Sequence, residues 1–256
     1  MLDTLTLSCH LVRRNWWVYK KSFISNISPT LADPAFMILS LGVGLGAYMA
    51  KVQGHTYLQF LAPGLAVSTA MFTAFFETSY GFYVRLTYEN IFKAMLTTPI
   101  GVTEVVLGEF IWVALKGALM VFGVCLVLSV LGLFANPLLL VISPIVGVLV
   151  ALPLGAMGLL ASCYVRNINQ FQTVYSFLIA PVYFFSGIFF PVEQMPAAVQ
   201  WIAKALPLYH GVKLSQSLFW NQNVLSTWLF HAPVLVVYSV ALLYLAFLKV
   251  RIKLQN

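Results

Sequence analysis

The chain has 256 residues, of which only 8% are charged and 61% are hydrophobic, and its formal net charge is +7. Soluble domains carry about 25% charged residues, so this composition excludes a water-soluble enzyme, a disordered chain and a disulfide-rich secreted domain. A chain this apolar must bury most of its surface in lipid, and its basic balance points to a membrane surface rather than to nucleic acid. The sequence therefore predicts an all-α integral membrane protein.

Residues 1–29 predict an amphipathic helix that lies in the membrane interface. Apolar side chains recur there at helical spacing, and the basic residues lie mainly off that stripe. The stripe consists of Leu5, Cys9, Val12, Trp16, Tyr19 and Phe23. A basic amphipathic helix with tryptophan is typical of the interface, whereas a helix packed on a partner is the alternative. Ser28-Pro29 and Asp33-Pro34 are expected to break the chain before it enters the bilayer.

Apolar runs predict a domain of six transmembrane helices within residues 30–250, because about 20 apolar residues cross the hydrocarbon. The runs are residues 34–50, 52–84, 117–165, 167–192 and 214–248, the last with its helix from about Thr227. Residues 117–165 are too long for one crossing, and Asn136-Pro137 predicts the turn of a helical hairpin. Gly42 and Gly46 predict a small-residue face for packing between helices.

Six spans place both termini on one side of the membrane, and the Lys and Arg bias identifies that side as the cytoplasm. The basic residues of this side are Arg13, Arg14, Lys20, Lys21, Arg85, Lys93, Arg166, Lys249, Arg251 and Lys253. The opposite loops carry Lys51, Lys204 and Lys213, and Lys116 is placed near a helix start. We therefore expect a multi-pass membrane protein whose residues 251–256 form a cytoplasmic tail.

A cytoplasmic segment between the second and third spans, about residues 85–99, predicts a short helix. Tyr88, Ile91, Phe92 and Met95 share one face, and Glu89 and Lys93 have the spacing of an i,i+4 ion pair. The segment begins at Arg85 and Pro99 ends it. Such a helix either rests on the lipid surface or docks onto a cytosolic partner.

An external segment, about residues 187–207, predicts a broken hairpin after the fifth span. Ser186-Gly187 interrupts that span, and Pro191 and Pro196 follow. Val199, Ile202, Ala203 and Leu206 then form a short apolar stripe with Trp201 beside it. This pattern predicts a helix that dips back into the outer leaflet, and a plain external loop is the alternative.

A search for catalytic and metal-binding motifs finds no P-loop, no zinc-type spacing among the four scattered histidines and no nucleophile elbow. We therefore expect no catalytic site and no metal on this chain.

Glu77 lies inside the second span without an intramembrane basic partner in the sequence. It is either a substrate or proton-relay group or a carboxyl hydrogen-bonded between helices. Aromatic side chains accompany it on the second and fifth spans. With Glu77, a candidate substrate path comprises Phe72, Phe76, Tyr80, Phe171 and Tyr175, although ordinary packing is the alternative.

The order of these segments resembles the membrane subunit of type-2 ABC exporters, and within them the nodulation-factor (lipo-oligosaccharide) export permease branch. Three stretches carry the resemblance. They are residues 87–108, Ser186-Gly187-Ile188-Phe189-Phe190-Pro191 with Met195-Pro196, and Leu206-Pro207-Leu208-Tyr209-His210.

The resemblance implies a location in the bacterial inner membrane and a homodimer of this chain with two copies of a separate cytosolic ATPase, which binds ATP and Mg. The segment at residues 85–99 would be the coupling helix that docks into this ATPase. The cargo implied is a lipid-linked glycan, a lipo-oligosaccharide or a similar amphipathic lipid. The open alternatives are drug or antibiotic efflux by the same type of permease, a stand-alone proton-coupled transporter that uses Glu77, and a membrane acyl- or glycosyltransferase, which the empty motif search disfavours.

Overall fold

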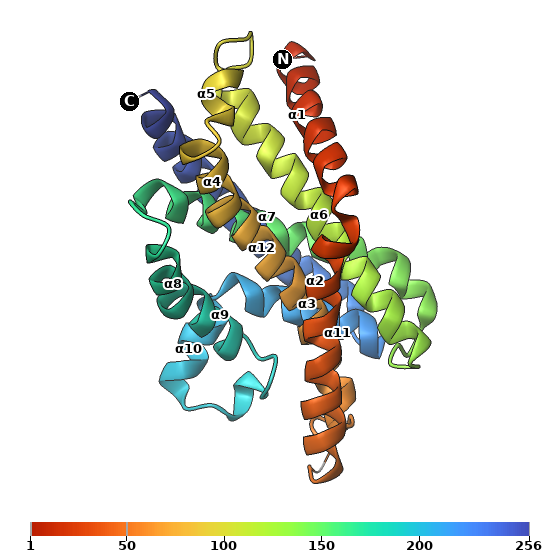
Figure 1. The fold of residues 1–256 in the computed structure, drawn as a ribbon. Helices are drawn as coiled ribbons and strands as arrows, with labels where there is room; N and C mark the ends of the chain where they lie inside the picture. The colour runs from red at the N-terminus through yellow and green to blue at the C-terminus, as the bar shows by residue number, and fades with distance from the viewer. Residues whose placement is uncertain (1, 50, 256) are drawn as a thin grey trace.

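The computed structural model describes residues 2–49 and 51–255, and the chain is almost entirely helical within these ranges (Figure 1). In chain order, with η for π- and 3₁₀-helices, the elements are α1 (Leu2–Lys21), α2 (Phe23–Met37), η1 (Ile38–Gly44), η2 (Leu45–Ala47), α3 (Tyr57–Phe76), η3 (Glu77–Gly81), α4 (Phe82–Thr87), α5 (Ile91–Met95), α6 (Val102–Val130), η4 (Pro137–Ile142), α7 (Ser143–Tyr164), α8 (Gln170–Val174), η5 (Tyr175–Ile179), α9 (Ala180–Phe185), η6 (Val192–Gln194), α10 (Ala197–Ala205), α11 (Pro207–Trp220) and α12 (Val224–Gln255). The two ends of the chain and α5 lie at the same end of the molecule (Figure 1). The all-α class predicted from the sequence is confirmed.

Four helical stretches of the described chain are long and apolar enough to cross a membrane. They are Tyr57–Thr87, Val102–Val130, Pro137–Tyr164 and Val224–Leu254. Of the two other predicted spans, the first contains only a shorter apolar helix, Ala32–Ala47, and the fifth is divided among α8, η5 and α9. The multi-pass architecture is confirmed, and the arrangement of six spans stays a prediction.

The N-terminal segment differs from the prediction in two ways. Helix α2 runs through Pro29 and Pro34 without a break, since a proline removes one bond of the ladder and the neighbouring bonds can continue the helix. In α1, the face that packs on α6 includes the buried Leu11 and Tyr19, whereas Leu5 is 50% exposed. The predicted apolar stripe is therefore divided, since Val12, Trp16 and Tyr19 pack around Trp112 of α6, whereas Leu5 and Cys9 are exposed.

The two central spans α6 and α7 form the predicted hairpin around Asn136. The Asn136 side chain accepts a hydrogen bond from the Leu138 amide (3.1 Å), and Pro137 begins the next helix. Along this pair the backbones approach closely, because a Cβ added to Gly117 would lie 3.0 Å from the carbonyl oxygen of Gly147. Only glycine permits this approach, so the two helices pack backbone to backbone.

A buried helix that the sequence did not predict, α11, lies against α3, α7 and α12. Pro63 lies inside α3 and has no amide hydrogen, which leaves the carbonyl of Gln59 without its usual helical donor. The indole nitrogen of Trp220 donates a hydrogen bond to this oxygen (3.1 Å), and the Ser215 hydroxyl donates to the carbonyl of Pro63 (3.0 Å). The last span consequently begins at Val224, after α11.

The first apolar segment packs on α3 through one of the two predicted glycines. A Cβ on Gly42 would lie 2.5 Å from the Leu58 side chain, whereas Gly46 has only ordinary contacts. The close approach at Gly42 is confirmed, and it joins η1 to the core of the bundle. That core is centred on α3, whose residues from Phe60 to Met71 are all buried.

Candidate functional site

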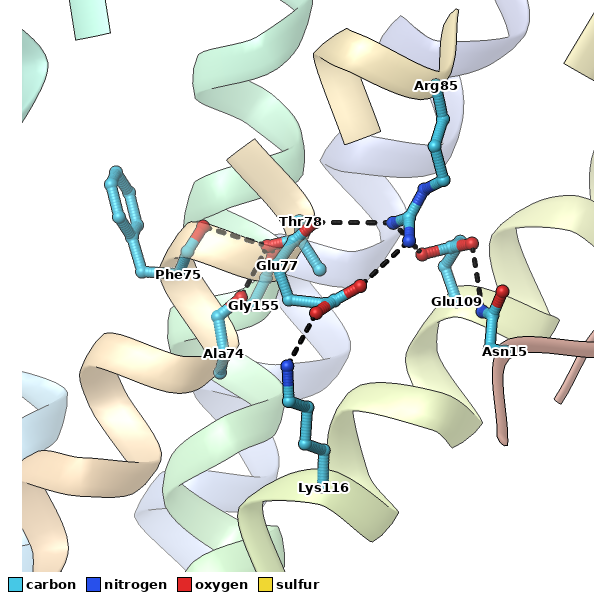
Figure 2. Close-up of polar contacts among 9 residues, drawn as sticks. All are labelled: Asn15, Ala74, Phe75, Glu77, Thr78, Arg85, Glu109, Lys116 and Gly155. Carbon is cyan, nitrogen blue, oxygen red and sulfur yellow. Dashed lines mark hydrogen bonds and ion pairs between the residues drawn. The ribbon is translucent and has the colours of Figure 1, made fainter. Parts of the chain in front are cut away.

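Five polar side chains meet where α3 ends and η3 begins (Figure 2). The Glu77 carboxylate contacts Arg85 Nη1 and Lys116 Nζ, each at 2.7 Å. Arg85 Nη2 lies 2.7 Å from the second carboxylate, that of Glu109, and the Asn15 amide donates a hydrogen bond to Glu109 (3.3 Å). We name this set of five residues the ionic cluster.

The spacing of these residues along their helices explains how the ionic cluster assembles. Glu109 and Lys116 are seven residues apart on α6, which is close to two full turns, so they share one face. Glu77 opens the π-helix η3, and Arg85 follows in α4, where its guanidinium also bonds the carbonyl oxygen of Glu77 (3.3 Å). Asn15 comes from α1. The ionic cluster thus joins the N-terminal helix to two spans.

Charge in the ionic cluster is balanced and nearly removed from solvent. Glu109 is fully buried, and the side chains of Glu77, Arg85 and Lys116 are 13–16% exposed. Ions buried this far from water persist only when oppositely charged partners and hydrogen bonds compensate them. Here two carboxylates alternate with two cations, so the set can be buried without net charge.

Two expectations about these residues are wrong. Glu77 is not without partners, and Lys116 lies in the middle of α6 rather than near a helix start. Sequence reasoning missed the ionic cluster because it began the third span at residue 117. The seven-residue interval between Glu109 and Lys116 was the available signal.

A threonine next to the ionic cluster ties η3 to α7. The Thr78 hydroxyl lies 2.8 Å from the carbonyl of Ala74 in α3 and 2.7 Å from that of Gly155 in α7 (Figure 2). Gly158, one turn later, lies so close that an added Cβ would be 2.7 Å from the carbonyl of Phe75. The end of α3 that carries Glu77 is therefore held against α7.

The aromatic residues predicted as a substrate path do come together. Phe76 stacks on Phe72 and on Tyr175, with ring centres 6.4 and 5.9 Å apart, and Tyr80 contacts Phe171 edge to face at 6.1 Å. We name these five residues the aromatic seam. Its rings join α3 and η3 to α8 and η5, and Phe76 and Tyr80 are nearly half exposed.

Glu77 does not belong to the aromatic seam. Its carboxylate is engaged by Arg85 and by Lys116 of α6, so the predicted path divides into an aromatic part and an ionic part. The aromatic part has exposed rings that a ligand could stack on. The ionic part is a set of buried ion pairs that connects η3 and α4 to α6.

The predicted coupling segment contains a helix much shorter than residues 85–99. Only α5 (Ile91–Met95) is helical between Thr87 and Val102, and Arg85 belongs to α4. Asn90 adopts a left-handed conformation (φ 52°) and separates Glu89 from α5. The Lys93 side chain lies outside the described residues, so its pairing with Glu89 stays a prediction.

Within this segment Phe92 points inward. It is fully buried and stacks on Phe82 with ring centres 4.6 Å apart, and Met95 packs on the same group of apolar side chains. Tyr88 is 60% exposed, and Glu89 and Pro99 are exposed as well. One side of the segment is thus anchored on the bundle and the other is free.

The segment predicted as an external hairpin is interrupted after α9. Gly187 has a φ of +81°, which favours glycine, and Pro191 is buried. Pro196 is exposed and precedes α10. On α10 the side chain of Ala203 is buried, whereas Ile202 is 59% and Trp201 77% exposed, so the dip of this helix into the outer leaflet stays a prediction.

Polar contacts hold the hairpin to α11 and α12. Although burial opposes it, a hydrogen bond from Lys213 Nζ (2.9 Å) lowers the pKa of the Glu193 carboxyl below its usual value. Two of the four histidines meet in space, contrary to the expectation that all are scattered, since the Nδ1 atoms of His210 and His231 lie 2.7 Å apart. Within the described residues no three His, Cys, Asp or Glu side chains form a group that could hold a metal.

Comparison with known proteins gives consistent matches along the chain. A profile of the family described as "ABC-2 type transporter" matches residues 6–220. Nodulation protein J of Rhizobium leguminosarum bv. viciae is 34% identical over 228 residues, which cover 89% of this chain and 87% of that protein. Nodulation protein J of Rhizobium meliloti (strain 1021) is 30% identical over 91% of this chain and 88% of that protein. The inner membrane transport permease YadH of Escherichia coli (strain K12) is 20% identical over 76% of this chain and 75% of that protein.

Proposed function

This chain belongs to the ABC-2 type transporter family and is the membrane subunit of an ABC exporter, and we propose that it acts as a gate driven by a separate cytosolic ATPase. A gate of this kind does mechanical work only when nucleotide binding to its partner favours one of two arrangements of the spans. ATP and Mg²⁺ would bind on the ATPase. This chain would receive the motion and transmit it.

The coupling role is proposed for the segment around α5. The observation that carries it is the complete burial of Phe92 against Phe82, which makes α5 a stiff extension of the spans rather than a loose loop. Tyr88 and Glu89 remain exposed beside it for contact with a partner. About one turn before Tyr88, the chain passes through the ionic cluster at Arg85, which contacts Glu77. A push on α5 would therefore reach α6 and α1 through buried charges.

The cargo path is proposed along the aromatic seam, between two copies of this chain. Phe76 and Tyr80 are large apolar rings that a single copy leaves exposed. Both rings lie on a membrane-spanning segment, where lipid, cargo or a second copy of the chain covers an exposed apolar face. Aromatic faces suit both sugar rings and acyl chains, so we propose a lipid-linked glycan, a lipo-oligosaccharide or a similar amphipathic lipid as the cargo.

We further propose that both termini and α5 face the cytoplasm of a bacterial cell and that the hairpin around α10 faces outward. The asymmetry of Lys and Arg supports this orientation. Six spans would then include the shorter segments at α2 and at α8 to α9.

Reconstitution tests the proposal. The chain should be purified with its ATPase, identified by what co-elutes in mild detergent, and placed in liposomes with a fluorescent lipo-oligosaccharide. ATP-dependent movement of the probe is the expected result, and Phe76→Ala should slow it while leaving ATP hydrolysis measurable. Full transport by this chain in the absence of any second polypeptide and of ATP would refute the proposal.

Drug or antibiotic efflux is the alternative that uses the same machine, and the same liposomes distinguish it by the probe that moves. A stand-alone proton-coupled transporter would need Glu77 to release and regain a proton. Both oxygens of that carboxylate are engaged by cations at 2.7 Å, which favours a permanently ionised structural group. This contact disfavours the proton-coupled alternative.

A further inference from the structure

The elbow between α1 and α2 contains a cavity that no part of the proposed export path uses. Its volume is about 700 Å³, within the range of about 300–1,000 Å³ that is typical of small-ligand sites. The lining consists of Trp16, Tyr19, Lys20, Lys21 and residues 22–25. Aromatic and basic side chains thus share one cavity.

Charge around the elbow is of a single sign. Between residues 4 and 32 the sequence has four basic residues, Arg13, Arg14, Lys20 and Lys21, and no Asp or Glu. Lys20 and Lys21 are exposed, and neither has an ion-pair partner among the described residues. The nearby carboxylates of the ionic cluster are already paired. The cavity therefore presents uncompensated positive charge to an anionic ligand.

The side chains of the elbow indicate its depth in the membrane. Trp16, Tyr19, Lys20 and Lys21 line the same cavity. Aromatic and basic side chains on one amphipathic helix are typical of the headgroup level of a membrane. Lys116 of α6 adjoins the elbow, since its ammonium lies 5.2 Å from the centre of the Tyr19 ring.

Hydrogen-bond donors and an apolar surface both adjoin the cavity. The Tyr19 hydroxyl is buried and has no hydrogen-bond partner among the described residues, and Ser22 makes no side-chain cap on the first turn of α2. Ile24, which lines the cavity, and Phe36 and Leu39 farther along α2 and η1 are 63–78% exposed. A ligand with a phosphate at one end and acyl chains at the other matches both surfaces.

We propose that the elbow cavity binds the headgroup of an anionic phospholipid, with its phosphate at Lys20 and Lys21 and its acyl chains along the exposed face of α2. The lipid stabilises the angle between α1 and α2. Because Tyr19 contacts Lys116 of the ionic cluster, the bound headgroup also fixes the position of α1 against α6. This site does not depend on the identity of the cargo or of the ATPase.

Native mass spectrometry of the full chain in mild detergent tests the site, with phosphatidylglycerol and phosphatidylcholine as probes. The wild-type chain should retain phosphatidylglycerol in preference. Two surface lysines contribute about 1 kcal/mol each toward anionic lipid, so the K20Q/K21Q variant should bind phosphatidylglycerol about 30-fold more weakly. The matched control, K249Q/R251Q, removes equal charge near the end of α12 and should keep the preference. Ser25→Trp fills the cavity without changing its charge, so this variant should lose the preference for phosphatidylglycerol.

Several outcomes would overturn the proposal. Equal binding of the two lipids to the wild-type chain would exclude an anionic site, and an equal loss in K20Q/K21Q and K249Q/R251Q would indicate general surface charge. Displacement of phosphatidylglycerol by excess inorganic phosphate at matched ionic strength would indicate a free-anion site instead. The measurement involves neither ATP nor export, so its failure is distinct from failure of the proposed function.

Discussion

Replacing Arg85 with Met is expected to destabilise the folded chain strongly. Arg85 contacts Glu77 and Glu109 at 2.7 Å each, and Glu109 is fully buried. Without the guanidinium, Glu77 keeps Lys116, whereas Glu109 keeps only a 3.3 Å hydrogen bond from an asparagine. Removing one partner of a buried ion pair costs about 3–5 kcal/mol. At about 2–4 °C per kcal/mol for a chain of this length, the unfolding midpoint should fall by roughly 10 °C.

A second substitution separates the cost of the unpaired charge from the loss of side-chain volume. In the R85M/E109Q variant the buried carboxylate becomes a neutral amide, which can still accept the hydrogen bond from Asn15. We expect this double variant to recover at least about 2 kcal/mol of the loss, because the two residues interact directly. Lys213→Met is the matched control, since its partner Glu193 is 49% exposed and such pairs contribute about 0–1 kcal/mol.

Thermal unfolding in detergent, followed by tryptophan fluorescence, measures these differences. The four proteins should rank as wild type, K213M, the double variant and R85M in order of decreasing midpoint. Two results would show that the buried ionic cluster does not stabilise the fold. One is that R85M unfolds at the same temperature as K213M, and the other is that the double variant is no more stable than R85M.

Three further expectations concern other parts of the molecule. Phe92→Ala should lower the free energy of unfolding by about 3–5 kcal/mol, because it empties a buried site. Glu89→Ala should leave the unfolding midpoint unchanged and reduce ATP-driven export. A normal export rate in both variants would count against coupling through α5. Gly158→Ala should destabilise the fold by about 1–3 kcal/mol, because the added methyl group meets a backbone carbonyl of α3. Gly123 has open space around it, so Gly123→Ala should leave the stability unchanged. Equal unfolding midpoints for the two variants would contradict the close packing at Gly158. The lowered pKa of Glu193 implies stability that is present above its unfolded pKa and lost as the pH falls through its folded pKa. The midpoint difference between wild type and Glu193→Gln should therefore vanish in acid, and a difference independent of pH would exclude the ion pair as its cause.

The sequence alone was sufficient for the class of protein and for most of its segments. A composition of 8% charged residues leaves no soluble fold available, and turn residues such as Asn136-Pro137 and Gly187 act locally, through backbone geometry. Family membership also followed from local motifs, and the match over residues 6–220 confirms it. The aromatic seam was partly foreseeable, because helical spacing places Phe72, Phe76 and Tyr80 on neighbouring turns.

The tertiary structure decided which helix packs against each helix face. The partners of Glu77 come from positions 8 and 39 residues away, and helical periodicity describes one helix without saying which helix packs against it. In the same way, α11 is buried because α3, α7 and α12 surround it, and its Trp220 satisfies the carbonyl that Pro63 leaves free in α3. A uniformly apolar sequence gives little contrast between faces that meet lipid and faces that meet protein. For this reason four of the predicted spans could be recognised one by one from the sequence, whereas the ionic cluster between them became visible only when they were packed together.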